Sequence, residues 1–288
     1  MIKYFSHLKR FGLLMLVLFF QNTYSQVIET TRVLNIDPAK STIRTRFQPP
    51  KGFSWVNEQP GSFSEFLSNF PLHPPNLPVR DFTKIPVDQQ NHHAALLKIT
   101  VGEKDLQQCA DAWIRLYAEY LWLHKKFDDI GFEFTDGQFF AWDDYKIGFR
   151  TKEVRKKVSF VKTKISDDSY EGFQKYLEVI FRYAGTISLN EESVPVTNNA
   201  DIRSGDFLIK PGSPGHSVII VGVARNQAGK KLYILAESYM PAQDVHILVN
   251  HKSPQISPWY ELDIDAPQTV TAKYIFKPTS IKRFHALQ

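Results

Sequence analysis

The sequence predicts an α+β fold in which helices from the first half of the chain pack on an antiparallel sheet from the second half. Residues 105–126 and 170–184 carry apolar side chains at the helical spacings of three and four. After Val194 the chain changes to short runs of β-branched and aliphatic residues. Helical segments followed by a group of strands are typical of an α+β domain.

Residues 1–25 predict a signal peptide. Lys3, Lys9 and Arg10 precede the apolar run at residues 12–20, and no acidic residue occurs in this segment. Small residues stand three positions and one position before Gln26, as cleavage there requires. The run of nine residues is shorter than the ~20 that a membrane-spanning helix needs. We therefore expect export to the periplasm or the medium, and no transmembrane segment in the mature chain.

The mature chain is expected to contain an extended N-terminal arm at residues 26–46 and a single α+β domain at residues 47–288. The domain opens with a proline-rich segment that reaches Pro78 and that we expect to cover the core. Within this segment, residues 62–70 predict a short helix capped by Ser62, with phenylalanine side chains on one side.

The middle of the chain predicts helices separated by short strands. A strand at residues 94–101 is followed by a long helix that runs from an Asp105 cap to about Lys126. The remaining elements are a strand at 132–134, a helix at 139–145 and an amphipathic helix at 170–184 that Gly185 ends.

The predicted sheet follows. Its strands are expected at residues 206–209, 217–224, 231–236 and 245–249. Residues 226–229 supply a hairpin turn between the second and third of these strands.

Charge and motifs exclude several function classes. The chain has 35 basic and 30 acidic residues, and loss of the signal peptide leaves 32 against 30, a net charge of +2. No stripe of basic residues with interleaved aromatics occurs, which argues against a nucleic-acid partner. The motifs HExxH, CxxC and GxGxxG are absent, so we expect no metal and no cofactor. We expect a monomer.

Cys109 is the single cysteine, and a lone cysteine in an exported chain is a candidate reactive thiol. Near the start of a helix, its thiolate would be favoured by the helix dipole. His216 stands directly before the most apolar strand, where a general base would be held rigidly. The candidates for the orienting group are Glu237, Ser238, Gln243 and Asp244. Glu237 is preferred, although a one-residue change of register would place Ser238 on the face of His216 instead.

Substrate contacts are expected beside this group. Backbone amides at the helix start, helped by Gln108, would hold an oxyanion, and Ser238 and Tyr239 would contact the substrate.

A second interpretation stays open. Cys109 lies on the apolar stripe of its helix, and unpaired cysteine is among the most buried residue types. In that case the protein would be a non-catalytic binding module of the cell envelope. Its groove would be lined by the aromatic residues Trp55, Trp142, Tyr239 and Trp259.

The chain also resembles two known families. Residues 205–209 (GDFLI) and 215–221 (GHSVIIV) resemble the signature of NlpC-type and CHAP-type peptidoglycan amidohydrolases. That resemblance implies a papain-like fold, a cell-wall peptide substrate, His216 as general base and Cys109 as nucleophile.

The second resemblance covers nearly all of the mature chain. Residues 105–121, 183–189, 236–245 and 257–260 look like the secreted bacterial family catalogued as domain of unknown function 4846. It implies one domain of about this size and no particular activity.

Overall fold

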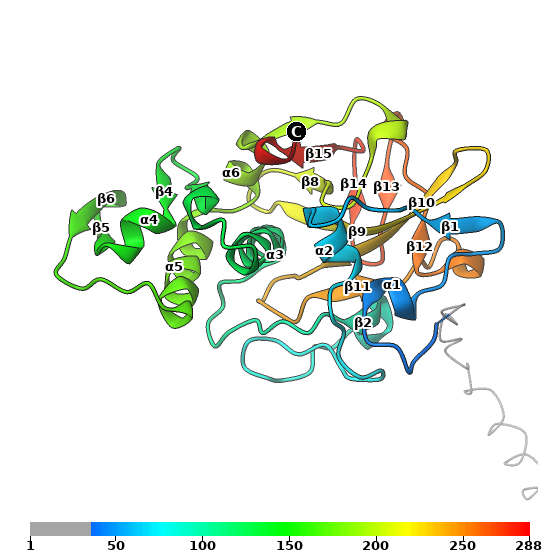
Figure 1. The fold of residues 1–288 in the computed structure, drawn as a ribbon, viewed down its shortest axis with the longest axis horizontal. Helices are drawn as coiled ribbons and strands as arrows, with labels where there is room; N and C mark the ends of the chain where they lie inside the picture. Colours follow the sequence, from blue (N-terminus) through cyan, green and yellow to red (C-terminus); the bar gives the residue numbers. More distant parts are fainter. Residues whose placement is uncertain (1–35) are drawn as a thin grey trace, which may run out of the picture. The chain divides into compact units, whose positions relative to one another are not determined.

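A nine-stranded antiparallel sheet forms the centre of the protein in the computed structural model, which describes residues 36–288 (Figure 1). The predicted signal peptide and residues 26–35 of the predicted arm lie outside the described residues. The main strand order is β2-β11-β10-β9-β8-β15-β7, with β1 added beside β9 and β12 beside β10. The strands are β1 (Phe53–Trp55), β2 (His93–Leu96), β7 (Ser193–Pro195), β8 (Phe207–Lys210), β9 (His216–Asn226), β10 (Lys231–Glu237), β11 (His246–Leu248), β12 (Trp259–Tyr260) and β15 (Ile281–Phe284).

The two faces of the sheet pack against different parts of the chain. One face, which includes Ile219 and Ile234, packs with the helices in the larger apolar core. The other face, which includes Val218 and Leu235, packs with C-terminal segments through residues such as Phe276. The C-terminal segments include the hairpin β13 (Thr269–Val270) and β14 (Ile275–Phe276). The α+β prediction is therefore confirmed.

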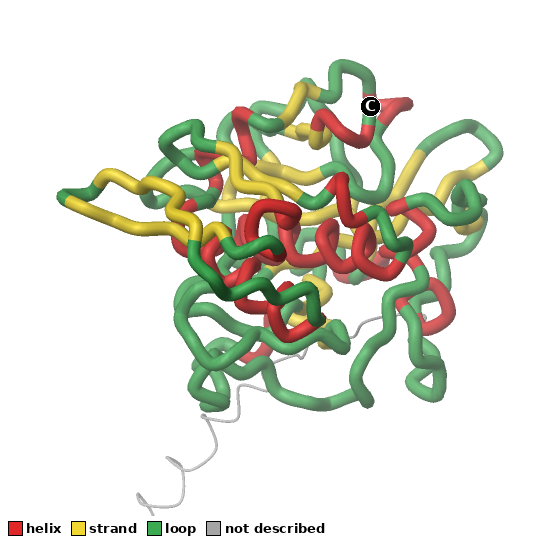
Figure 2. The backbone as a smooth tube through the Cα atoms, turned by 60° about the vertical axis from the view of Figure 1, so that its left-hand side comes forward, coloured by secondary structure: helices red, strands yellow, loops and turns green. Residues whose placement is uncertain are grey.

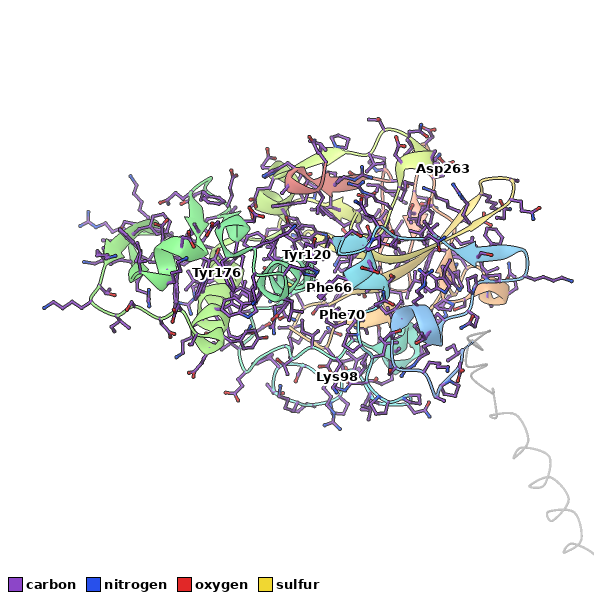
Figure 3. All side chains as sticks on the ribbon, viewed as in Figure 1. Phe66, Phe70, Lys98, Tyr120, Tyr176 and Asp263 are labelled. Atoms are coloured by element: carbon purple, nitrogen blue, oxygen red, sulfur yellow. The ribbon has the colours of Figure 1, made fainter. Side chains whose placement is uncertain are left out.

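Helix α3 (Cys109–Leu123) lies at the heart of the larger core, and its residues 109–121 are all buried. The Trp113 indole Nε1 donates to the carbonyl of Gly205 at 2.9 Å, which ties the helix to the sheet side. Helix α2 (Phe63–Ser68) packs on α3, where the rings of Phe66 and Tyr120 are 5.7 Å apart (Figure 3). Ser62 caps α2 by accepting from the Glu65 N–H, as its sequence predicts.

The remaining helices are short except for α5 (Tyr170–Tyr183), which follows its predicted range closely. Two small hairpins, β3 (Gly131–Glu133) with β4 (Phe139–Ala141) and β5 (Phe149–Val154) with β6 (Lys157–Lys162), stand apart from the main sheet (Figure 1). Long loops connect these elements (Figure 2). The other short helices are α1 (Ile43–Arg46), α4 (Trp142–Lys146) and α6 (Thr186–Glu191).

Several local expectations differ from the structure. Residues 43–46 of the predicted extended arm form α1, whose Ile43 is fully buried in the larger core. The helix expected at residues 139–145 begins only at Trp142, after the strand β4. The hairpin β5–β6 was not expected, because its turn is made by Arg155 and Lys156 at φ of 51° and 64° rather than by glycine.

None of the helices between residues 36 and 288 combines the length and the apolar character that crossing a bilayer requires. The described residues, 36–288, belong to one compact unit.

Candidate functional site

Three polar side chains form a row across three neighbouring strands of the sheet. His216 begins β9, Glu237 ends β10 and His246 begins β11. Glu237 and His246 are directly opposite in the strand register. The His216 Nε2 lies 2.9 Å from Glu237 Oε2, and the His246 Nε2 lies 3.7 Å from Glu237 Oε1. All three side chains are buried, so this row is an internal polar network and not a surface feature.

A β-bulge places Glu237 in this row. Ile234 pairs with Gly222, but Leu235 pairs with Ile220, so that Val221 has no partner in β10. A one-residue shift in register moves every later side chain to the other face of a sheet. Without the bulge, Ser238 rather than Glu237 would share the face of His216. The structure thus resolves the alternative that the sequence left open, in favour of Glu237.

The loop before His216 is held by the start of helix α6. The Thr186 hydroxyl donates to the Gly212 carbonyl at 3.1 Å and accepts from the Gly212 N–H at 3.3 Å. A Cβ atom at Gly215 would lie only 2.2 Å from the Thr186 Oγ1, so glycine is required there by close approach. These contacts fix the position from which His216 enters the sheet.

Cys109 is the first residue of helix α3, whereas the sequence placed the helix start at Asp105. Asp105 does not cap the helix, because its Oδ1 accepts from the Ala242 N–H at 2.7 Å and from the Gln108 amide at 3.0 Å. The Gln108 N–H instead donates to Asp111 Oδ2 at 3.0 Å. The thiol therefore stands at the end of the helix where the dipole stabilises an anion most strongly.

The helix start is tied to the end of β10. The Ser238 hydroxyl lies 3.2 Å from the carbonyl of Gln107 and 2.7 Å from that of Gln243. Together with the bond from Ala242 to Asp105, this contact joins the loop before Cys109 to the chain that follows Glu237. A helix and a strand that are distant in the sequence are thereby held in one position relative to each other.

Cys109 lies close enough to His216 to affect the protonation of its imidazole. Burial alone would lower the pKa of His216, but hydrogen bonds to Cys109 and Glu237 and the charges of both groups raise it to about 9. Because Nε2 contacts Glu237, the other ring nitrogen is the one left for the thiol. Cys109 keeps 7% of its surface exposed and His216 keeps 2%. The structure therefore brings together Cys109, His216 and Glu237, with less exposure of the thiol than the sequence suggested.

Two further buried groups, Asp111 and His246, affect the distribution of charge in the site. Burial raises the pKa of the Asp111 carboxyl well above its usual range, which disfavours a second negative charge beside the thiol. Burial and repulsion from Lys273 lower the pKa of His246 to about 3. The neutral ring of His246 donates from Nδ1 to the Asp244 carbonyl at 2.8 Å, so its Nε2 has no proton to donate to Glu237.

Of the side chains predicted to contact the oxyanion or the substrate, only that of Tyr239 lies against His216. Gln108 directs its amide to Asp105, and Ser238 is fully buried on backbone carbonyls, so neither side chain points freely at a substrate. Tyr239 is half-buried, and its ring centre lies 5.0 Å from that of His216. Among residues 36–288, no hydrogen bond is recorded from the N–H groups of Cys109 and Ala110, the first two of helix α3.

The neighbouring Gln107 is a residue that sequence reasoning missed. Its side chain is buried, and its Oε1 accepts from Arg115 Nη1 at 3.0 Å. Within the described part of the chain its Nε2 has no hydrogen-bond partner. The only sequence signal is its place two residues before Cys109, which does not distinguish it from Gln108.

Two aromatic rings from the β13–β14 hairpin also contact His216. Tyr274 and Phe276 have ring centres 4.7 Å and 5.9 Å from the imidazole. By contrast, Trp142 and Trp259, expected in the groove of a binding module, are 1% exposed and belong to the core. Apart from Tyr239, the aromatic residues around His216 therefore come from the C-terminal segment, which the sequence did not indicate.

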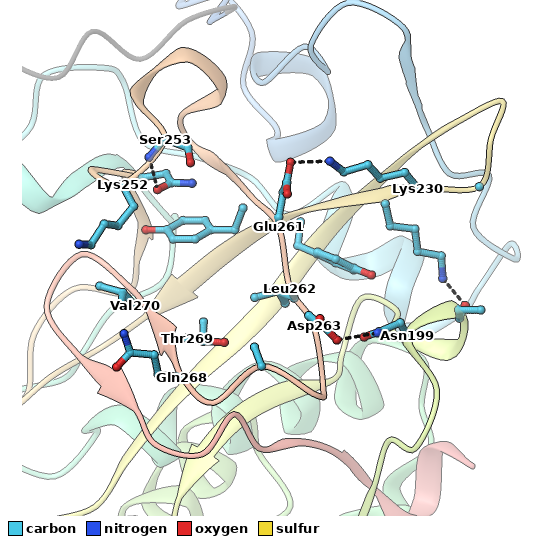
Figure 4. Close-up of a pocket in the computed structure, with 17 residues that line it drawn as sticks. Asn199, Lys230, Lys252, Ser253, Glu261, Leu262, Asp263, Gln268, Thr269 and Val270 are labelled. Carbon is cyan, nitrogen blue, oxygen red and sulfur yellow. Dashed lines mark hydrogen bonds and ion pairs between the residues drawn. The ribbon is translucent and has the colours of Figure 1, made fainter.

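A separate pocket of about 600 Å³ lies away from this site, and neither Cys109 nor His216 lines it (Figure 4). Two of its charged groups have polar partners, Lys230 with Glu261 at 2.7 Å and Asp263 with Asn199 at 2.8 Å. In the described part of the chain no three His, Cys, Asp or Glu side chains are grouped so that they could hold a metal ion.

Comparison with known proteins places the chain in a family. The model of the family described as domain of unknown function (4846) matches residues 43–283. This chain belongs to that family. The match includes Cys109, His216 and Glu237, so all three residues lie within the family domain. No curated protein and no solved structure matches the chain, so the likeness to NlpC-type and CHAP-type enzymes rests on sequence motifs alone.

Proposed function

We propose that this protein is an exported cysteine hydrolase with a papain-like arrangement, which cleaves an amide bond in a peptide. Cell-wall peptides are the proposed substrate class. The observation that carries the proposal is the His216 imidazole, which bonds to the Glu237 carboxylate and is close enough to the Cys109 thiol at a helix start to be affected by it. A thiol, a base and an orienting acceptor are the three groups that nucleophilic catalysis by cysteine needs.

The proposed reaction has two steps. The Cys109 thiolate attacks the amide carbonyl, and the His216 imidazolium protonates the leaving amine as the C–N bond breaks. A water molecule, deprotonated by His216, then attacks the thioester and releases the acid and the free thiol. The N–H groups at the start of α3 would stabilise the oxyanion in both steps. Glu237 would hold the imidazole in position and stabilise its charge.

Alkylation by iodoacetamide at pH 7 tests the first requirement, a reactive thiolate. Because Cys109 is the only cysteine, one adduct in the intact mass reports on it alone. We expect the native protein to react about ten- to thirty-fold faster than a His216→Gln variant, since an ordinary thiol is only a few per cent ionised at this pH. His124→Gln, an exposed histidine at the other end of α3, serves as the matched control and should react like the wild type.

The low exposure of Cys109 favours the second interpretation, a binding module with an inert thiol. The same experiment separates the two. Labelling that occurs only in denaturant would exclude the hydrolase. Rapid labelling of the native protein, followed by release of peptides from a digest of cell-wall material that Cys109→Ser does not produce, would support it.

A further inference from the structure

Lys273 is a half-buried cation beside the candidate site, and no acidic partner is recorded for it in the described part of the chain. Its Nζ lies 5.5 Å from the ring centre of Tyr239. No carboxylate oxygen in residues 36–288 lies within 4.0 Å of the Lys273 Nζ, the distance limit for an ion pair. By contrast, Lys104, Lys175 and Lys230 each have such a partner. Burial lowers the pKa of Lys273, and the negative charge of Glu237 opposes this effect. A cation that is partly removed from water without a partner costs free energy that a ligand anion can recover.

The position of Lys273 connects it to the chemistry. Tyr239 is near both the cation and His216, and its ring centre lies 5.0 Å from that of the imidazole. The distances of 5.0 and 5.5 Å together place the ammonium within 10.5 Å of the His216 ring centre. The next residue, Tyr274, also packs on His216, so the segment that carries Lys273 lies against the site.

The histidines near Lys273 do not neutralise its charge. His92 and His93 are near enough for the charge of Lys273 to contribute, after burial, to lowering their pKa values. The nearest acid that the cation senses, Glu237, is fully buried and already bonded to His216. An anion that approaches Tyr239 from solvent would therefore meet Lys273 without competition from Glu237.

We propose that Lys273 binds a carboxylate of the substrate, so that the enzyme selects peptides with an acidic group within about three residues of the cleaved amide. An extended peptide spans at most about 3.6 Å per residue, so three residues can cover the distance from the His216 ring centre to the ammonium. This inference rests on the proposed function and adds a specificity-determining residue and a substrate class to it.

Matched alkylating probes test the inference without a known substrate. N-iodoacetyl-glutamate α-amide and N-iodoacetyl-glutamine α-amide have nearly the same shape and differ by one negative charge. The thiolate displaces iodide from either probe, forming a C–S bond as the C–I bond breaks. We expect the wild type to react about two- to five-fold faster with the acidic probe, the range for a partly exposed ion pair. The preference should fall in 0.5 M salt.

Three variants assign the preference to Lys273. Lys273→Met and Lys273→Gln should react equally with both probes, and Lys273→Arg should keep the preference. Lys157→Met removes the same charge in the distant β5–β6 hairpin and should behave as the wild type. Circular dichroism and urea unfolding show whether each variant is folded, and the two neutral variants together guard against a loss of folding in one of them.

The outcomes distinguish the two proposals. If neither probe labels the native protein, the proposed hydrolase and the substrate class are both excluded. If both probes label the wild type at equal rates, or if the preference persists in Lys273→Met and Lys273→Gln, the role of Lys273 is excluded while the reactive thiol remains.

Discussion

At the scale of single residues, the two buried histidines on either side of Glu237 are held in opposite charge states. His216 contacts a thiol and a carboxylate, both of which favour its protonated form, and its pKa rises to about 9. His246 gains a single backbone acceptor and is fully buried, and its pKa falls to about 3. The difference assigns the proton at neutral pH to the ring that faces Cys109.

This assignment predicts the titration of both rings. Between pH 5 and pH 10, the Cε1–H resonance of His216 should titrate with a midpoint near 9, while that of His246 should not move. Glu237→Gln removes the charge that stabilises the imidazolium, so the His216 midpoint should shift to lower pH. The measurement is a proton NMR titration, with His216→Gln and His246→Gln to assign the signals. A His216 midpoint near the ordinary 6.5 would contradict the assignment.

At the scale of elements, turn chemistry and tertiary contacts decide what the sequence could predict. The α5 helix and the strands β8 to β11 follow from hydrophobic periodicity and from the turn at residues 226–229. The start of α3 could not be predicted, because Asp105 bonds to Ala242, a residue far away in the sequence. The strands β12, β13 and β14 are each two residues long, too short to show any period.

The backbone conformation of the β5–β6 turn lowers the stability of the protein, and a substitution should remove this effect. Arg155 and Lys156 both adopt the left-handed conformation, which costs side chains with a Cβ about 1 kcal/mol or more. Replacing them with Asn and Gly, the residues preferred in such a turn, should raise the free energy of unfolding by about 1 kcal/mol. Urea unfolding measures the change.

A glycine in the adjoining strand provides the control for this substitution. Lys157→Gly lies within β6 and should lower the stability by about 0.5–1 kcal/mol. Equal effects of the two changes would show that the conformation of the turn is not responsible.

At the scale of the whole molecule, the candidate site is assembled from segments that span most of the chain. Cys109 and His216 could be proposed from sequence because one is the single cysteine, near the start of a predicted helix, and the other directly precedes a predicted strand. The preference for Glu237 over Ser238 could rest only on side-chain chemistry, since the deciding β-bulge depends on the pairing of β9 with β10. Tyr274 and Lys273 gave no signal, because they reach the site through the packing of a short hairpin on the sheet.

Export is a proposal for the whole chain that a direct measurement can test. Expressed in a bacterium with a periplasm, the protein should appear there with Gln26 as its first residue, as determined by intact mass and N-terminal sequencing. Leu16→Arg places a charge in the apolar run and should leave the full-length chain in the cytoplasm. The same change at Leu123, an exposed position of α3, should not affect processing. An uncleaved wild-type chain in the cytoplasm would contradict the proposal.

The unpaired position of Val221 also determines where residues can be inserted into or deleted from the β9–β10 hairpin. The tip of the β9–β10 hairpin, at residues 227–230, could gain or lose residues without turning any side chain around, because the strands on both sides would keep their pairing. Between Val221 and His216 the opposite holds. Deletion of one residue there would turn the side chains of that part of β9 to the opposite face of the sheet. The His216 imidazole would then face away from Glu237.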